Sequence, residues 1–261
     1  MTKWSREITD EIIRWLQSRK SYLTASDFKE LAPLYRGLKE SEAKAATDKR
    51  YKPESKRADL RKKIEAIWLN KKRLTIDTFE TEAMRRGHCL EPEAVDVYCN
   101  NTGEVFYHWD DALLYKPGTN LAASPDALDL KQPEDIVTGD VSKFKPLHAL
   151  EVKCFNTENH WRNYRADDKM KIDEDILFQI AWQLYVMELE DVTVVFFNPD
   201  LPEFAVKTYS YTGEDLKEYI DLIPDVVNYY NEYTAELEYT IPTTEFKLNA
   251  FEPELAEQFE V

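Results

Sequence analysis

Three observations predict an α/β fold, in which a core of strands is flanked by helices. Apolar residues recur at helical spacing through the N-terminal part of the chain. From Val105 onward the pattern changes to short segments that are rich in β-branched and aromatic residues. A strongly apolar helical segment, Ile172–Leu189, separates the third of these segments from the fourth. This order of helix, three strands, helix and strand is typical of an α/β core.

The N-terminal part is predicted to be helical. Its first segment carries an apolar stripe that includes Trp15 and Leu16. Either Thr24 or Ser26 is expected to cap the second segment, because both side chains can accept a hydrogen bond from a first helical turn. The predicted helices cover 4–18, 27–36, parts of 39–73 with a break near Pro53, and 77–99 with an interruption or restart near Gly87–Pro92.

The strands are predicted from their composition and from the turn residues between them. A last helix or helix pair is expected over 214–235 with a break at Pro224, and the acidic tail 250–261 is expected to be mobile. The predicted strands are Val105–Trp109, Leu121–Leu130, Leu147–Phe155, Val192–Phe197 and Phe204–Tyr209.

The composition argues against several classes of protein. No stretch approaches the roughly 20 apolar residues that a membrane span requires, and the N-terminus has no apolar signal-peptide core. The three cysteines are an odd number, which does not favour a disulfide framework. Only six glycines are present, which argues against a glycine-rich nucleotide-binding fold. We therefore expect a cytoplasmic protein without a membrane partner.

The charge is unevenly distributed along the chain. The net charge is −16, yet residues 1–90 hold 22 basic and 14 acidic side chains, whereas residues 91–261 hold 12 and 36. Within the first part, the segment 49–73 carries 11 Lys and Arg against 3 Asp and Glu. Such a block can attract a polyanion even in an acidic protein, because salt screens distant charges. A solvated lysine-rich helix surface explains the same pattern, so the charge permits a DNA partner without establishing one.

A set of residues suited to metal-dependent chemistry lies in two of the predicted strands. Ser124-Pro125-Asp126 falls in one strand, and Glu151 and Lys153 fall in the next, where residues two apart share a face. If these strands pair, Asp126 and Glu151 converge, and two adjacent carboxylates favour a cation between them. Oxygen ligands suit Mg²⁺ or Mn²⁺. A lysine beside them can position the attacking hydroxide and offset charge on a phosphate.

On its own, this pattern also fits a salt bridge on the surface of a strand. Glu91, on the predicted helix before the strands, is placed where it could reach the same metal. Gln179 and Gln183 follow the Glu-x-Lys strand and share one face of a helix, because they are four residues apart. That face lies beside an apolar stripe, so these amides are expected to be partly buried and to need partners. An exposed helix edge is the alternative.

Taken together, the ordered motifs resemble those of the lambda-exonuclease, or YqaJ-type viral recombinase, family of the PD-(D/E)XK nuclease superfamily. The resemblance covers roughly residues 12–200, and its N-terminal part matches the family's Trp, Arg and Thr-Ala-Ser positions in spacing. It implies a restriction-endonuclease-like core, with a central mixed β-sheet between helices. The motifs are Trp15…Arg19…Leu23-Thr24-Ala25-Ser26, Leu90-Glu91-Pro92-Glu93-Ala94, Ser124-Pro125-Asp126, Leu150-Glu151-Val152-Lys153-Cys154 and Gln179…Gln183.

The resemblance also implies the roles of the residues that would perform catalysis. Asp126 and Glu151 would ligate Mg²⁺, for which Mn²⁺ is a possible substitute, and the carbonyl of Val152 would be a third ligand. Glu91 would support this metal or a second one. Lys153 would orient and activate the attacking water.

Four further residues have implied roles. Gln179 would help to hold the lysine or the water. Arg19, Ser26 and Ser124 match the arginine and serines that bind the 5′-phosphate of the digested strand in the family. A planar guanidinium and hydroxyl donors suit a terminal phosphate dianion.

The chain departs from the family pattern at several positions. Ala127 stands where the family commonly has glycine, and 24 residues separate Asp126 from Glu151, more than in the family's short hairpin. The extra segment 131–146 is expected to be an inserted loop at the rim of the site. The lysine-rich segment 39–73 is a second enlargement and is expected to contact the duplex backbone. Charge reversal at four positions there should then weaken DNA binding: Lys62, Lys63, Lys71 and Lys72.

The implied function is a Mg²⁺-dependent 5′-to-3′ exonuclease on linear double-stranded DNA, which leaves 3′ single strands for phage-type recombination. DNA ends, a single-strand annealing protein and further copies of the chain are the expected partners, the copies forming a ring, expected to be a trimer. The protein would act in the cytoplasm of a bacterial host. We expect one nuclease domain over 1–261, with a basic helical part at 1–75, a catalytic core at 76–210 and a C-terminal helix and acidic tail at 211–261.

Two alternatives remain open. A sequence- or structure-specific endonuclease of the same superfamily would use the same active-site residues. A catalytically idle DNA-binding or DNA-mimicking phage protein fits the acidity, but such a protein has no need for Asp126, Glu151 and Lys153.

Overall fold

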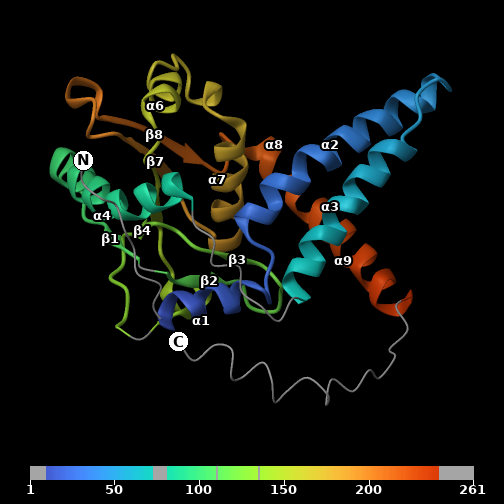
Figure 1. The fold of residues 1–261 in the computed structure, drawn as a ribbon, viewed down its shortest axis with the longest axis horizontal. Helices are drawn as coiled ribbons and strands as arrows, with labels where there is room; N and C mark the ends of the chain where they lie inside the picture. Colours follow the sequence, from blue (N-terminus) through green and yellow to red (C-terminus); the bar gives the residue numbers. More distant parts are fainter. Residues whose placement is uncertain (1–9, 73–80, 110, 135, 241–261) are drawn as a thin grey trace.

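In the computed structural model, two small sheets lie beside a group of long helices (Figure 1). The structure describes residues 10–72, 81–109, 111–134 and 136–240. Parts of two predicted helices, 4–9 and 77–80, and the predicted mobile tail 250–261 lie outside the described residues. No helix of the described part combines the length and the apolar character that crossing a membrane requires.

The described helices and strands follow in mixed order along the chain. The helices are α1 (Asp10–Arg19), α2 (Ala25–Thr47), α3 (Glu54–Lys72), α4 (Glu82–Thr102), α5 (Val141–Phe144), α6 (Thr157–Tyr164), α7 (Glu174–Met187), α8 (Lys217–Ile220) and α9 (Leu222–Thr240). The strands are β1 (Tyr107–His108), β2 (Leu113–Tyr115), β3 (Ala122–Ala123), β4 (Ala127–Leu128), β5 (Thr138–Asp140), β6 (His148–Lys153), β7 (Asp191–Phe197) and β8 (Val206–Thr212).

The larger sheet is mixed and has the strand order β1-β4-β6-β7-β8. Only β6 and β7 run parallel, with Glu151 opposite Val194, and the connection between them contains α6 and α7. The smaller sheet has the order β3-β2-β5, and β2 and β5 are parallel. The prediction of an α/β fold, with a central mixed sheet flanked by helices, is confirmed.

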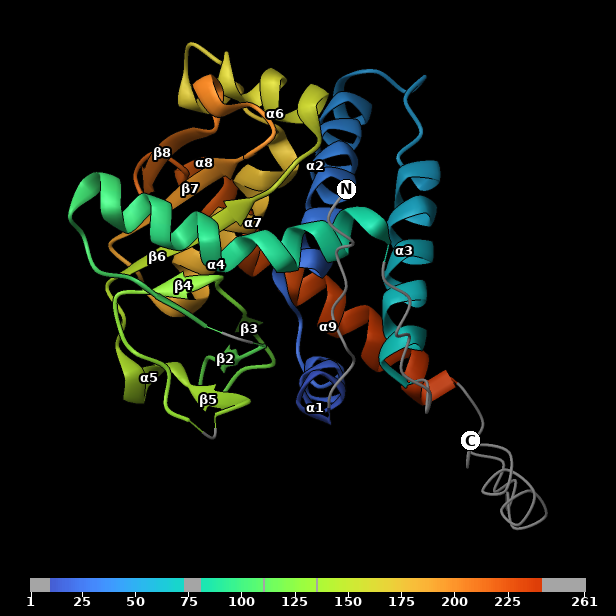
Figure 2. The same ribbon diagram turned by 60° about the vertical axis from the view of Figure 1, so that its left-hand side comes forward.

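Helices cover both faces of the larger sheet. In Figure 2, α4 crosses the sheet in front of β4 and β6, and α7 lies behind it. On the α4 side, Leu90 and Ala94 pack with Leu150 and Val152 of β6. The other side is the larger core, where α7 lies between the sheets and α2, and where α2, α3 and α9 pack against one another (Figure 1). Because side chains alternate along a strand, β6 contributes to both cores.

Two helices differ from prediction. The second extends from Ala25 through Pro33 to Thr47, and Thr24 forms its N-terminal capping box with Asp27. The predicted interruption of the fourth near Gly87–Pro92 is wrong, since α4 is continuous from Glu82 to Thr102 and ends at Gly103, whose φ is +78°. Burial of apolar side chains on both sides of each proline, such as Leu90 and Ala94 in α4, outweighs the local preference for a break.

The predicted strand Leu121–Leu130 is wrong in one important respect. It is divided into β3 and β4, which belong to different sheets, and Ser124-Pro125-Asp126 lies between them rather than in a strand. Pro125 cannot donate a hydrogen bond to a neighbouring strand, which favours the break at this position. The segment 131–146 also differs from prediction, because it contains β5 and α5 as well as loop.

The break predicted near Pro53 is confirmed between α2 and α3, and the predicted C-terminal helix pair is α8 and α9. The predicted break at Pro224 is wrong, because the pair divides at Asp221 and Pro224 lies in the first turns of α9, where the missing N–H has no helical partner to lose. The division into one nuclease domain with three parts stays a prediction.

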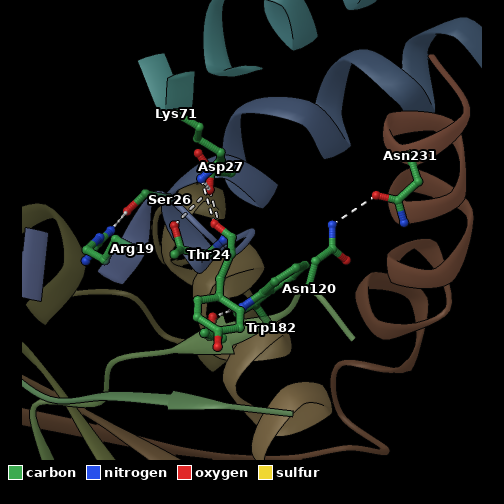
Figure 3. A network of polar contacts seen from close by, with 10 residues as sticks. Arg19, Thr24, Ser26, Asp27, Lys71, Asn120, Trp182 and Asn231 are labelled. Carbon is green, nitrogen blue, oxygen red and sulfur yellow. Dashed lines mark hydrogen bonds and ion pairs between the residues drawn. The ribbon is translucent and has the colours of Figure 1, made fainter. Parts of the chain in front are cut away.

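Several lysines of the basic segment 39–73 form ion pairs within the protein, so fewer of them are available to DNA than the charge alone indicates. Lys71 of α3 reaches the start of α2, where its ammonium contacts Asp27 at 2.9 Å and the carbonyl of Tyr22 at 2.6 Å (Figure 3). Lys63 pairs with Glu30, and Lys72 pairs with Glu238. Three of the four lysines proposed for charge reversal therefore already form ion pairs within the protein, and a loss of DNA binding in that variant would not by itself identify a DNA contact.

Candidate active site

A cavity of about 480 Å³ opens where the larger sheet meets α1, α2 and α4. We call it the site cavity. It contains side chains from both ends of the predicted motif set, although these are far apart in the sequence. All nine residues that the sequence identified line it: Arg19, Ser26, Glu91, Ser124, Asp126, Glu151, Val152, Lys153 and Gln179.

The alternation of β6 determines which side chains meet α7. Val152 packs into the core on the α4 side, so Glu151 and Lys153 point to the opposite side, as predicted. There the ammonium of Lys153 contacts a carboxylate oxygen of Glu151 and donates to Oε1 of Gln179 at 3.2 Å. Gln179 in turn donates from Nε2 to Oε1 of Glu151 at 2.6 Å. These three side chains form a closed set of hydrogen bonds.

Gln183 holds the second oxygen of the same carboxylate. Its Nε2 donates to Oε2 of Glu151 at 2.5 Å, and both side chains are only 1% exposed. The predicted need of the two amides for partners is thus confirmed. Within the described residues, Oε1 of Gln183 is buried without a hydrogen-bond partner, which is costly for a carbonyl oxygen. Glu151 is therefore fixed in orientation by amides from two successive turns of α7.

Asp126 reaches Glu151 from the loop before β4. Its Oδ2 accepts a hydrogen bond of 2.6 Å from the backbone N–H of Val152, which fixes its carboxylate beside β6. Burial and then the nearby carboxylates of Glu151 and Glu91 raise the pKa of Asp126 well above its ordinary range, although Lys153 opposes this. The predicted convergence of Asp126 and Glu151 is confirmed, and it is achieved by a loop rather than by a strand.

Lys153 is held as a cation in this acidic surrounding. Burial lowers the pKa of its ammonium, but the charges of Glu151 and Asp126 outweigh that effect, so that the pKa is raised above its ordinary value. An ammonium with a raised pKa donates hydrogen bonds and attracts anions, but it does not accept a proton near neutral pH. Lys153 is accordingly suited to orient a water or a phosphate and not to act as a base.

Glu91 enters the cavity from α4. It lies on α4 directly after the buried Leu90, and its Oε2 is 3.8 Å from Nε2 of His108. Its charge contributes to the raised pKa of Asp126, so the two carboxylates are close enough to interact. His108, on β1, was not selected from the sequence; a lone histidine in a short strand carries no signal that distinguishes it.

The donor set fits a hard divalent cation. Asp126, Glu151 and Glu91 offer carboxylate oxygens, and the pKa of Asp126 is raised first by burial and then by the negative charges of the other two carboxylates, which Lys153 offsets only in part. Both oxygens of Glu151 and Oδ2 of Asp126 accept hydrogen bonds from protein donors, however, and no group of three His, Cys, Asp or Glu side chains within the described part of the chain is arranged as a ready-made metal cluster. The residues present match Mg²⁺ in chemistry, and binding would need these side chains to adjust.

The wall opposite β6 carries the residues expected to bind a terminal phosphate. Arg19, at the end of α1, donates from Nη2 to Oγ of Ser26 at 3.3 Å, as Figure 3 shows, and its guanidinium lies 4.6 Å from the ring centre of Trp15. Burial lowers the pKa of Arg19, while Asp27 and Asp111 oppose this. Ser124 faces the same cavity and donates to the carbonyl of Ala112 at 2.6 Å.

One cation in this wall was overlooked in the sequence. Lys29 lines the site cavity from α2, three residues after Ser26. The helical spacing from Ser26 was the available signal, since residues three apart share a helix face. The much higher charge density of the lysine-rich segment 39–73 favours that segment as the basic surface instead.

The chain is similar to several solved structures. The structure of LHK-Exo in complex with dAMP is 22% identical, with a TM-score of 0.54, over 87% of this chain and 95% of that chain. A second structure of LHK-Exo, an alkaline exonuclease from Laribacter hongkongensis, is 19% identical, with a TM-score of 0.46, over 86% and 99%. A phage-related exonuclease from Haemophilus somnus 129PT is 14% identical, with a TM-score of 0.47, over 68% and 83%.

At these identities the likeness to LHK-Exo shows a shared fold, the PD-(D/E)XK-like fold. No curated protein matches the chain. The family model of the YqaJ-like viral recombinase domain matches residues 14–190, which include every residue of the candidate site. The chain therefore belongs to the YqaJ-like viral recombinase family.

Proposed function

We propose that the protein is a Mg²⁺-dependent exonuclease that digests one strand of linear double-stranded DNA from its 5′ end. One observation carries the proposal: a single cavity joins three convergent carboxylates and a lysine with an arginine and two serines suited to a terminal phosphate. Membership of the family and the shared fold support an exonuclease of the phage type. LHK-Exo forms a complex with dAMP, a mononucleotide of the kind that such an enzyme releases.

In this proposal Asp126, Glu151 and the carbonyl of Val152 hold Mg²⁺, with Mn²⁺ as a possible substitute, and Glu91 supports it or a second ion. When bound, the ion supplies Lewis acidity for hydrolysis of a phosphodiester. The cation also offsets the negative charge that raises the pKa of Asp126.

The side chains around Glu151 prepare the site for the reaction. Gln179 and Gln183 donate to the two carboxylate oxygens of Glu151 and so preserve its orientation before substrate binds. Lys153 remains protonated and can orient the attacking water and attract the developing negative charge of the phosphate. Gln179 accepts a hydrogen bond from Lys153 and limits the positions that the ammonium can adopt.

The 5′-to-3′ polarity of digestion depends on the cavity wall opposite β6. Arg19, Ser26 and Ser124 are proposed to bind the 5′-terminal phosphate, because a guanidinium and hydroxyl groups can together donate to several of its oxygens. A phosphate held there places the first phosphodiester of the strand near Lys153. A strand that begins with a 5′-hydroxyl lacks this anchor and should be digested more slowly.

The product would be duplex DNA with 3′ single strands, suited to phage-type homologous recombination by strand annealing. We propose that the protein acts in the cytoplasm of a bacterial host, together with a single-strand annealing protein, and as a homo-oligomeric ring, expected to be a trimer. A ring with basic residues toward DNA and acidic residues outside would reconcile a net charge of −16 with a DNA substrate.

One assay distinguishes the candidate functions. Purified protein is incubated with linear, nicked and closed circular duplex DNA, with and without a 5′-phosphate, in Mg²⁺ or in EDTA. Loss of linear DNA alone, in Mg²⁺ and faster with a 5′-phosphate, is the expected result. Cleavage of closed circles would indicate an endonuclease instead, and intact DNA under every condition would indicate a catalytically idle DNA-binding or DNA-mimicking protein.

A further inference from the structure

A second cavity adjoins the site cavity. It has a volume of about 470 Å³ and lies beside the start of α7. We call it the adjoining cavity. Three residues line both cavities, namely Lys29, Lys153 and Gln179. The two cavities therefore meet at these residues, and a chain molecule that leaves the site cavity here would enter the adjoining one.

Lys29 has an unusual position at this junction. It lies one helical turn after Ser26 on the same face of α2, so its ammonium follows the proposed 5′-phosphate contact along the cavity wall. Its side chain is half-buried, and among the described residues it makes no hydrogen bond or ion pair. Other lysines that reach α2 are paired, as Lys71 is with Asp27 and Lys63 is with Glu30.

The charges around the junction leave Lys29 available to an anion. The ammonium of Lys153 contacts Glu151, so its charge is largely balanced within the protein. In the adjoining cavity, Asp173 pairs with Arg162 at 2.6 Å and Glu174 pairs with Arg36 at 2.8 Å. These two acidic groups are thus paired within the protein, whereas Asp175, the third acidic residue of the adjoining cavity, has no ion pair among the described residues.

We infer that the two cavities form one passage for the digested strand and that Lys29 binds its phosphate backbone where they join. The inference rests on the proposed nuclease function and adds a substrate-binding residue to it. A phosphate there completes a row of anion contacts that runs from Arg19 and Ser26 through Lys29 toward Lys153. The strand would be held on both sides of Glu151, and not only at its 5′ end.

Three variants test this role: Lys29→Gln removes the charge, Lys29→Arg retains it, and Lys143→Gln is the matched control. Lys143 is an exposed lysine of α5 that lines neither cavity. Binding of a 5′-phosphorylated duplex with a frayed 5′ end is measured by fluorescence anisotropy in EDTA, at several salt concentrations. Digestion of the same DNA in Mg²⁺ gives KM and kcat.

For Lys29→Gln we expect a Kd and a KM raised on the order of tenfold, and a salt slope smaller by about 0.7 to 0.9, the loss of one phosphate contact. Lys29→Arg should restore both quantities, and Lys143→Gln should leave them unchanged. An unchanged salt slope in Lys29→Gln overturns the inference. So does a defect that Lys29→Arg does not rescue and that accompanies a lower Tm, because this marks a structural role.

The binding measurement requires no hydrolysis, so the two proposals can fail separately. If the wild-type protein digests no DNA, the proposed function is wrong, whatever the anisotropy shows. If the wild-type protein digests DNA and Lys29→Gln binds it with the same salt slope, only the role of Lys29 is wrong.

Discussion

The two sides of the site cavity are built in opposite ways. On the β6–α7 side, both oxygens of Glu151 and the ammonium of Lys153 are engaged by protein groups, and Glu151 is 1% exposed. On the α1–α2 side, Ser26 is exposed, Arg19 makes a long hydrogen bond of 3.3 Å to it, and Lys29 has no partner among the described residues. The groups on the β6–α7 side are already held by hydrogen bonds within the protein, whereas the cations on the α1–α2 side can still donate hydrogen bonds to a ligand.

This difference matches two kinds of task. A group that must hold a reactive geometry gains from buried hydrogen bonds, which fix its orientation before substrate arrives. A group that must bind a charged ligand gains from donors that are not already committed to carboxylates. We therefore expect changes on the β6–α7 side to affect mainly the rate of hydrolysis, and changes on the α1–α2 side to affect mainly recognition of DNA.

The largest effect is expected from Lys153→Ala. Loss of the ammonium removes the group that orients the water and attracts charge on the phosphate, so the single-turnover rate should fall by roughly 10³-fold. DNA binding in EDTA should persist, because the cations of the α1–α2 side remain. A variant that still digests DNA at the wild-type rate would contradict the role assigned to Lys153.

Gln183→Ala should have the next largest effect. It leaves Oε2 of Glu151 without its donor, and loss of such a support for a metal ligand typically costs about 10- to 100-fold in activity or metal affinity. We expect a lower kcat and a higher Mg²⁺ requirement, with an unchanged KM for DNA. Calorimetric titration with Mg²⁺ gives a second readout, and an unchanged Mg²⁺ affinity together with an unchanged kcat would show that Gln183 only fills space.

Arg19→Ala tests the other side of the cavity. The ratio of digestion rates on 5′-phosphorylated and 5′-hydroxyl DNA should fall by roughly 10- to 100-fold, since hydrogen bonds to a charged group typically contribute about 1.5 to 3 kcal/mol. The rate on 5′-hydroxyl DNA should change little. Arg19→Lys is the matched control, because it retains the charge and loses the paired donors. Equal losses on both substrates would place Arg19 among the groups that set the rate of hydrolysis.

A smaller effect is expected on stability, and its sign follows from Asp126. Its pKa is raised in the folded protein, so above the ordinary aspartate value of 3.8 the folded state binds more protons than the unfolded state. Without a divalent cation, the free energy of unfolding should therefore fall as pH rises from that value through the raised pKa. Asp126→Asn should lack this part of the pH dependence.

Mg²⁺ should restore the free energy of unfolding that is lost as the pH rises. At a hundredfold excess over its Kd, a ligand stabilises the folded state by about 2.7 kcal/mol, or roughly 5 to 10 °C in Tm for a protein of this size. Scanning calorimetry at neutral pH should show this rise for the wild type and a much smaller one for Asp126→Asn. Equal rises in the two proteins would show that Asp126 does not hold the ion.

The elements that follow from local pattern were predicted well. The strand β6, the helix α7 and the shared face of Glu151 and Lys153 depend on residues close in sequence, and alternation along a strand is enough to place them. The same local reasoning predicted a break in α4 and a continuous strand through Asp126, and both predictions were wrong. There, burial of Leu90 and Ala94 in one case, and assignment of β3 and β4 to different sheets in the other, overrode the local preference.

By itself, the sequence determined the α/β fold class, the family and nine of the residues that line the candidate site. Only the tertiary structure decided how those residues are held: Asp126 by the N–H of Val152, Glu151 by Gln183, and Lys29 at the junction of two cavities. The physical reason is the distance along the chain over which each kind of interaction acts. Helix and strand periodicity arises from neighbouring residues, whereas a hydrogen bond or a cavity wall between distant segments exists only after the sheet and α7 have packed.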